Sequence, residues 1–209
     1  MRTPVFDIGD TLMPCYRLQN QLIQERLRMQ GVEDPPEFPV NTFRIYNPSH
    51  VQEFLDMHGI EGDAEKLVEE YKDKEEKYLE ENRVFEMLRT ASEELGTVGF
   101  VSDNSLKGKD YFRGLLESRN VPYDGFVVSQ EVGVEKPDSK IFREFLSRRG
   151  GNGSDYTYFG NNVPRDIGCR KVGMDFVWVT QYETFSGSYG GRTLEELSFR
   201  SVKQALDNV

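Results

Sequence analysis

The segment from Val5 to Leu12 constrains the fold of this chain more than any other. It consists of a short apolar run, then Asp7, then a tight turn built from glycine and aspartate. An apolar run bounded by turn residues is typical of a buried strand in a parallel sheet. Asp7 would then lie at the carboxyl end of that strand, where open α/β sheets bind ligands. Taken alone, Asp7 also fits an ordinary Asx-type turn.

Further along the chain, short apolar runs alternate with segments of helical periodicity. This alternation predicts βαβ units, and therefore a parallel sheet with helices on both faces. The pattern favours loops at 129–136 and 181–192 and a final amphipathic helix at 194–206. The predicted strands after the first are 97–101, 126–128, 156–159 and 175–180.

The region between the first strand and residue 83 has a different character. Helical spacing of apolar residues recurs at 16–30, at 49–58 and from Asp63, a natural N-cap, to about 79. The third helix is mostly charged, with opposite signs four residues apart, which is typical of a solvated face. We therefore expect residues 13–82 to form a smaller all-helical domain, with residues 1–12 and 83–209 forming the α/β core. In the proline-rich connection, Phe38, Phe43 and Tyr46 fit either the packing of the insert or the lining of a ligand pocket, and we expect packing.

Composition excludes several classes of function. The chain has 209 residues and a net charge of −10, which argues against nucleic acid as a main partner. No apolar run approaches the roughly 18 residues of a membrane span, and the first strand begins too early to leave room for a signal peptide. Cys15 and Cys169 are far apart and fit reduced thiols, and His50 and His58 fit surface or packed positions rather than metal ligands. We expect a cytoplasmic monomer or homodimer without nucleic-acid or membrane partners.

Five polar residues each follow a separate predicted strand. Right-handed crossovers bring the carboxyl ends of parallel strands to one edge of the sheet, so these side chains are expected to meet there. A carboxylate nucleophile, a hydroxyl, a lysine and a second acid suit transfer of an anionic group. Individually, the serine also fits a helix N-cap, the lysine a surface position and the last acid a first-turn helix position. The five are Asp7, Ser102, Lys136, Asn161 and Asp166.

The ordered set resembles the haloacid dehalogenase superfamily, which consists mostly of phosphatases. Asp7 to Thr11 is similar to that family's first motif and Val101–Ser102 to its second. Lys136–Pro137, the most specific match, is similar to the third. The segment from Phe159 to Asp166 resembles the fourth.

This resemblance implies a Rossmann-like core and a helical insert of the C1 cap type. It implies that Asp7 is the nucleophile, that Ser102 donates a hydrogen bond to phosphate and that Lys136 stabilises developing charge. It assigns phosphate binding to Thr11, Asp103 and Asn104. It also implies a Mg²⁺ ion held by Asp7, the backbone carbonyl of Gly9, Asn161 and Asp166.

Two positions depart from the family pattern. Gly9 stands where family phosphatases carry a second aspartate, the general acid and base, and loss of such a group typically costs about 10²–10⁴ in rate. Asp10, one residue further on, is expected to point elsewhere. Asn161 stands where the fourth motif usually begins with aspartate, so we expect weaker Mg²⁺ binding.

Three functions fit these residues. The first is a Mg²⁺-dependent phosphatase acting on a small phosphorylated or otherwise anionic molecule, slow on alkyl phosphates and faster on acyl or aryl phosphates. The second is a binding or regulatory protein that keeps the anion site without turnover. The third is a metal-independent 2-haloacid dehalogenase, since halide leaves without a proton. That reaction needs an arginine for the substrate carboxylate, and the candidates are Arg17, Arg26, Arg28 and Arg44.

Overall fold

The computed structural model describes residues 2–39, 44–182 and 185–207. The chain divides into two compact units, Met1–Met13 with Leu79–Val209, and Pro14–Tyr78. No helix in these described ranges is long and apolar enough to cross a membrane.

The first unit is built on a six-stranded sheet in the order β3-β2-β1-β4-β5-β6, in which every neighbouring pair is parallel. β1 is central because β2 and β4 pair with its two sides. The chain therefore runs outward in one direction through β2 and β3 and in the other through β4 to β6, a switch point at which such sheets bind ligands. The strands are β1 Thr3–Phe6, β2 Val98–Ser102, β3 Tyr123–Val128, β4 Tyr156–Gly160, β5 Asp175–Val179 and β6 Arg192–Leu194.

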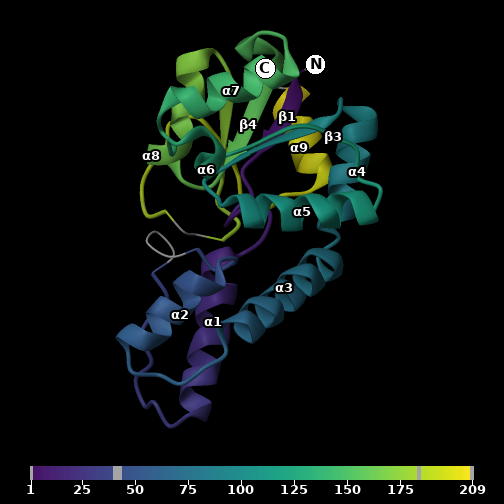
Figure 1. Ribbon diagram of the computed structural model, residues 1–209. Helices are drawn as coiled ribbons and strands as arrows, with labels where there is room; N and C mark the ends of the chain where they lie inside the picture. The colour runs from purple at the N-terminus through teal and green to yellow at the C-terminus, as the bar shows by residue number, and fades with distance from the viewer. Residues whose placement is uncertain (1, 40–43, 183–184, 208–209) are drawn as a thin grey trace. The chain divides into compact units, whose positions relative to one another are not determined.

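Helices of this unit lie around the sheet (Figure 1). On one face, Phe142 of α7 packs with Val101 and Tyr158. On the other, Phe112 of α5 meets Phe100 edge-on at 5.7 Å, because successive strand residues point to opposite faces. The predicted Rossmann-like parallel sheet with helices on both faces is thus confirmed. The helices are α4 Val84–Glu94, α5 Leu106–Ser118, α6 Ser129–Val132, α7 Ser139–Arg149, η1 Gly153–Asp155, α8 Val163–Asp166, η2 Ile167–Val172 and α9 Phe199–Asp207.

Three details of this unit differ from the sequence prediction. Residues 129–136, expected as a loop, contain α6, which ends where Gly133 at φ 76° donates its N–H to the Ser129 carbonyl. One helical turn is too short to show periodicity. β6 lies at the edge of the sheet, has only three residues and carries no apolar run. It occupies part of the segment expected as loop and final helix, so α9 begins at Phe199 instead of residue 194.

The second unit contains α1 Cys15–Met29, α2 Pro48–Met57 and most of α3 Ala64–Glu81. Asn47 caps α2 by accepting the Ser49 N–H, and Asp63 accepts the Lys66 N–H at 3.0 Å, as its predicted N-cap role requires. Phe38 and Tyr46 are buried, whereas Phe43 lies outside the described residues.

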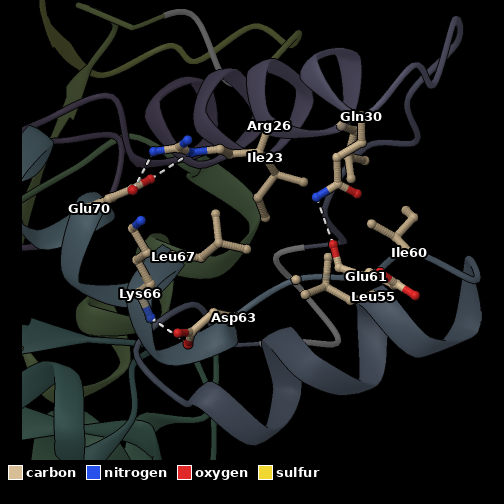
Figure 2. Close-up of a pocket in the computed structure, with 12 residues that line it drawn as sticks. Ile23, Arg26, Gln30, Leu55, Ile60, Glu61, Asp63, Lys66, Leu67 and Glu70 are labelled. Carbon is tan, nitrogen blue, oxygen red and sulfur yellow. Dashed lines mark hydrogen bonds and ion pairs between the residues drawn. The ribbon is translucent and has the colours of Figure 1, made fainter.

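A cavity of about 240 Å³ lies within the second unit (Figure 2). Apolar side chains such as Ile23, Leu55 and Leu67 form much of its lining. At its rim Arg26 pairs with Glu70, its Nε 2.8 Å from the carboxylate. None of the candidate site residues of the first unit lines this cavity.

Candidate active site

The predicted site residues of the first unit lie at the carboxyl edge of its sheet. Asp7 directly follows β1, Ser102 ends β2, Lys136 follows β3 and α6, and Asn161 and Asp166 follow β4. All five side chains are buried, with Asp166 fully shielded from solvent. The parallel order of the strands therefore places polar groups from separate parts of the chain in one shielded region.

The turn after β1 fixes the backbone around Asp7. The Asp7 N–H donates to the Phe159 carbonyl at 2.9 Å and so extends the ladder between β1 and β4. The chain then folds back through Asp10, at φ 54°, whose N–H donates to the Met13 carbonyl. Aspartate tolerates this left-handed conformation better than most residues. Beyond it, the buried Thr11 hydroxyl donates to Asn161 Oδ1 at 3.3 Å.

Lys136 is the centre of the site's electrostatics. Its Nζ lies 2.7 Å from Asp166 Oδ1, 3.0 Å from Asp7 Oδ2 and 4.0 Å from Asp103 Oδ2. The lysine is only 5% exposed, which excludes the alternative of a surface lysine. One ammonium group therefore offsets three carboxylates away from water.

The pKa values reflect this balance. Burial lowers the pKa of Lys136, but the negative charges of Asp166, Asp7 and Asp103 together raise it by more than burial lowers it. The net shift is upward, so the ammonium stays charged. Burial raises the pKa of Asp166 to about 6, although Lys136 opposes the shift. Burial also raises the pKa of Asp103, against the charges of Lys136 and Arg165. Burial disfavours the charged form of each group, and the attraction between the lysine and the carboxylates favours it.

Asp103 joins the loops that carry the site. Its Oδ1 accepts the backbone N–H of Lys136 at 2.9 Å, and its Oδ2 lies 3.0 Å from Arg165 Nη2. Asn104 connects neighbouring segments: its side chain accepts the Ser105 N–H, and its carbonyl accepts the Gln130 N–H. Phosphate binding by Asp103 and Asn104 stays a prediction, since the structure shows both residues holding backbone in place.

Ser102 does not cap the following helix. Ser105 caps α5, with its hydroxyl accepting the Gly108 N–H at 3.1 Å. Ser102 itself is 4% exposed at the end of β2, the strand beside β1. Its hydroxyl is thus at the same sheet edge as Asp7, and the capping alternative is wrong.

Sequence reasoning missed two residues of the site, Tyr158 and Arg165. The Tyr158 hydroxyl accepts a hydrogen bond from Lys136 Nζ at 3.1 Å. A tyrosine in a buried strand needs a hydrogen-bond partner for its hydroxyl, and this requirement could have indicated from the sequence that Tyr158 contacts a polar group. Gly160 leaves room for the Asp166 carboxylate, because a Cβ at this position would lie 2.3 Å from Asp166 Oδ2.

The predicted metal ligands offer hard oxygen donors, which Mg²⁺ prefers. Both Asp166 oxygens already accept hydrogen bonds, one from Lys136 at 2.7 Å and one from the Asn162 N–H at 2.8 Å. Within the described residues, no group of three His, Cys, Asp or Glu side chains is arranged to hold a metal. Asp7 and Asn161 thus supply a carboxylate and an amide oxygen, a set that fits Mg²⁺ retaining water and completing its shell with substrate phosphate.

The sequence profile of the haloacid dehalogenase-like hydrolases matches residues 5–179. The chain therefore belongs to this family of hydrolases, as its four motifs indicated.

Individual relatives give a finer picture. The chain is 28% identical over 194 residues to a glyceraldehyde 3-phosphate phosphatase of Methanopyrus kandleri, covering 83% of this chain and 82% of the relative. Among solved structures it resembles the magnesium-bound HAD-hydrolase YfnB of Bacillus subtilis, with a TM-score of 0.64, 17% identity and coverage of 99% and 98%. It also resembles a 2-haloacid dehalogenase of Pseudomonas syringae, with a TM-score of 0.56, 18% identity and coverage of 100% and 99%. At these identities the structural likeness shows the fold alone.

Proposed function

We propose that this hydrolase is a Mg²⁺-dependent phosphatase that forms an aspartyl-phosphate intermediate at Asp7 on a small phosphorylated metabolite. The observation that carries the proposal is the buried Asp7 carboxylate at the end of the central strand, 3.0 Å from Lys136 Nζ. A carboxylate beside a fixed cation is suited to attack the phosphorus of an anionic phosphate group. The phosphatase relative supports the same reaction class.

The chemistry follows from the residues in place. An oxygen of Asp7 attacks phosphorus, the new O–P bond forms, and the bond to the leaving oxygen breaks with its electron pair. The charge of Lys136 offsets the repulsion between carboxylate and phosphate, and the Ser102 hydroxyl donates to a phosphate oxygen. Water then attacks phosphorus, which releases inorganic phosphate and restores Asp7.

Gly9 limits the leaving group. It supplies no carboxyl to protonate the departing oxygen, and Asp10 is held in the left-handed turn conformation at φ 54°. The carboxylate of an acyl phosphate and the phenolate of an aryl phosphate leave without a proton, so these phosphates are the preferred substrates. Alkyl phosphates are cleaved slowly.

Mg²⁺ would be held by Asp7, the Gly9 carbonyl and Asn161, with Asp166 close by. When bound, the ion supplies Lewis-acid polarisation of the phosphoryl oxygens. Asn161 brings an oxygen without charge, so metal affinity is weak until a phosphate group adds its own ligands. Residues 13–82 are proposed as the cap, and the enzyme as a cytoplasmic monomer or homodimer without nucleic-acid or membrane partners.

A 2-haloacid dehalogenase is the second candidate. The observation that favours it is the commitment of both Asp166 oxygens to hydrogen bonds, which leaves fewer anionic donors for a metal. The arginine for the substrate carboxylate would be Arg17, Arg26, Arg28 or Arg44; of these, Arg26 pairs with Glu70.

The deciding experiment is hydrolysis of p-nitrophenyl phosphate with Mg²⁺ and with EDTA, by the wild type and Asp7→Asn. Its leaving group needs no general acid, so Gly9 does not mask activity. Turnover that requires both Mg²⁺ and Asp7 supports the phosphatase, and acetyl phosphate and glyceraldehyde 3-phosphate are then compared. Metal-independent release of halide from a 2-haloacid would establish the second candidate. A folded protein inactive in both assays would indicate a binding role.

A further inference from the structure

The Lys136 ammonium group has three N–H donors, and the structure accounts for each. Hydrogen bonds go to Asp166 Oδ1 at 2.7 Å and to the Tyr158 hydroxyl at 3.1 Å. This leaves one N–H for Asp7, whose Oδ2 lies 3.0 Å away. The direction of that last N–H therefore depends on the other two acceptors.

The Tyr158 hydroxyl is fixed as an acceptor toward Lys136. Its single proton is used on the Val101 carbonyl, 2.6 Å away. Its ring is fully buried and meets Phe142 edge-on at 5.2 Å, with Phe176 stacked at 6.5 Å. Packed on both sides, the phenol oxygen cannot follow the lysine if the ammonium moves.

We propose that Tyr158 is a positioning residue, which holds the ammonium of Lys136 so that its remaining N–H faces Asp7. With Asp166 as its single fixed acceptor, the ammonium group could still pivot about that hydrogen bond through the dihedral angles of the lysine side chain. A second fixed acceptor from β4 restricts that movement. The catalytic consequence rests on the proposed phosphatase function, whereas the hydrogen-bond arrangement does not.

The chain offers a matched control on the same strand. Tyr156 also faces α7, is buried and donates its hydroxyl proton to a backbone carbonyl, that of Gly150, at 2.7 Å. Tyr156→Phe and Tyr158→Phe each remove one such bond, but only Tyr158→Phe also removes an acceptor from Lys136. The difference between the two variants isolates the contact with the lysine.

For p-nitrophenyl phosphate with Mg²⁺, we expect Tyr158→Phe to lower kcat about tenfold with KM within about twofold, a pattern typical of lost transition-state stabilisation. Tyr156→Phe should stay near the wild type. Equal kinetics for the two variants, with the wild type active, would overturn the proposal.

A second readout does not require activity. In ¹H–¹⁵N spectra of lysine ammonium groups, the Lys136 signal, assigned by its loss in Lys136→Met, should be protected from exchange with water. Tyr158→Phe should shift it and speed its exchange at least about tenfold, and Tyr156→Phe should not. An unchanged signal in Tyr158→Phe overturns the inference even if the wild type proves inactive, in which case the proposed function fails separately. If Tyr158→Phe and Tyr158→Met both fail to fold while Tyr156→Phe folds, the role of Tyr158 is structural and the proposal is wrong.

Discussion

Each unit of this protein buries a carboxylate, and the two are stabilised in opposite ways. In the first unit, Asp166 is fully buried against the ammonium of Lys136, 2.7 Å away. In the second unit, Glu75 on α3 is equally buried, but its nearest hydrogen-bond partner is the neutral hydroxyl of Tyr46. One environment supplies a full opposite charge, and the other supplies phenols.

The pKa values of Glu75 and Asp166 can be compared in the same terms. Burial raises the pKa of Glu75 to about 7, and hydrogen bonds from Tyr46 and Tyr71 and the charge of Lys72 reduce the shift only in part. One oxygen of Glu75 has no hydrogen-bond partner among the described residues. Burial raises the pKa of Asp166 to about 6, with Lys136 opposing. Burial thus raises both pKa values, and Asp166 differs in having a cation in direct contact that opposes the shift.

The difference teaches what each cluster is suited to. A buried ion pair is weak evidence for stability, because desolvation offsets much of its attraction. The cation does, however, favour the ionised form of the carboxylate beside it. A carboxylate among phenols can take up a proton without breaking a pair. Changes in the partners should separate the two cases.

Removing the cation should have the largest effect. Lys136→Met leaves Asp7, Asp103 and Asp166 without their shared ammonium, and breaking a buried pair costs about 3–5 kcal/mol. We expect turnover of p-nitrophenyl phosphate to fall by about 10³-fold, since Lys136 offsets charge in the transition state. Urea unfolding and steady-state kinetics measure both effects. The exposed Lys107→Met is the control, and equal stability losses in the two variants would contradict the view of Lys136 as a buried partner.

Replacing Glu75 with a residue that does not titrate should have the next largest effect, on the pH dependence of the free energy of unfolding. Its folded-state pKa of about 7 exceeds the ordinary value of 4.5, so the folded state holds the proton more tightly. The associated stability is present below about pH 4.5, is lost as pH rises to about 7, and amounts to about 3 kcal/mol at most.

Glu75→Gln should lose this pH dependence and gain stability relative to the wild type between pH 5 and pH 8. Urea unfolding at both pH values measures it. The exposed Glu65→Gln on the same helix is the control. Parallel pH curves for the wild type and Glu75→Gln would show that Glu75 is already ionised at pH 5 in the folded protein.

The contrast between these clusters also shows what the sequence could and could not predict. Asp7, Lys136 and Asp166 were predicted to meet because each follows a strand of a parallel sheet, and backbone topology alone brings strand ends together. The parallel sheet and its strands β1 to β5 followed from the alternation of apolar runs and helical periodicity. β6 was not predicted, because three edge residues carry too little pattern.

Glu75 illustrates the other limit. It is one of twelve charged residues of α3, many of them with opposite signs four residues apart, and that pattern predicts a solvated face. Only the fold shows that Tyr46, from the connection before α2, covers it. Tyr158 was missed for a similar reason, since its partner Lys136 is 22 residues away in sequence. Local patterns do not specify such distant side-chain contacts.

Adding a carboxylate two residues after Asp7 should have a smaller effect, this time a gain. Gly9 is not among the glycines with positive φ, so an aspartate there needs no backbone strain. Gly9→Asp supplies a group to protonate the leaving oxygen, and we expect kcat/KM for glycerol phosphate to rise at least about tenfold relative to p-nitrophenyl phosphate.

Gly9→Asn has nearly the same size and hydrogen-bonding capacity without the acid, and it should show no such gain. A folded Gly9→Asp protein that binds Mg²⁺ and gains no more than Gly9→Asn would show that Gly9 does not limit the leaving group.

The smallest effect should come from Arg165, the second cation of the site. It pairs with Asp103 at 3.0 Å and Glu135 at 2.7 Å, and 28% of its side chain is exposed. Solvent screens such pairs, so Arg165→Gln should cost less than about 1 kcal/mol. Arg148 is a matched control, because it pairs with Glu131 of α6 and Glu144 of α7 and its side chain is 36% exposed.

Urea unfolding should give similar losses for Arg165→Gln and Arg148→Gln, both shrinking in 1 M salt because the Debye length falls to about 3 Å. Kinetics should differ, because Arg165 also holds Asp103, which accepts the backbone N–H of Lys136. We expect Arg165→Gln to lower p-nitrophenyl phosphate turnover two- to fivefold, an order-of-magnitude figure of roughly 0.5–1 kcal/mol in the barrier, and Arg148→Gln to leave it unchanged. Identical kinetics in the two variants would mean that Lys136 is held by its buried carboxylates and Tyr158 alone, and that the solvent-facing cation adds nothing to the site.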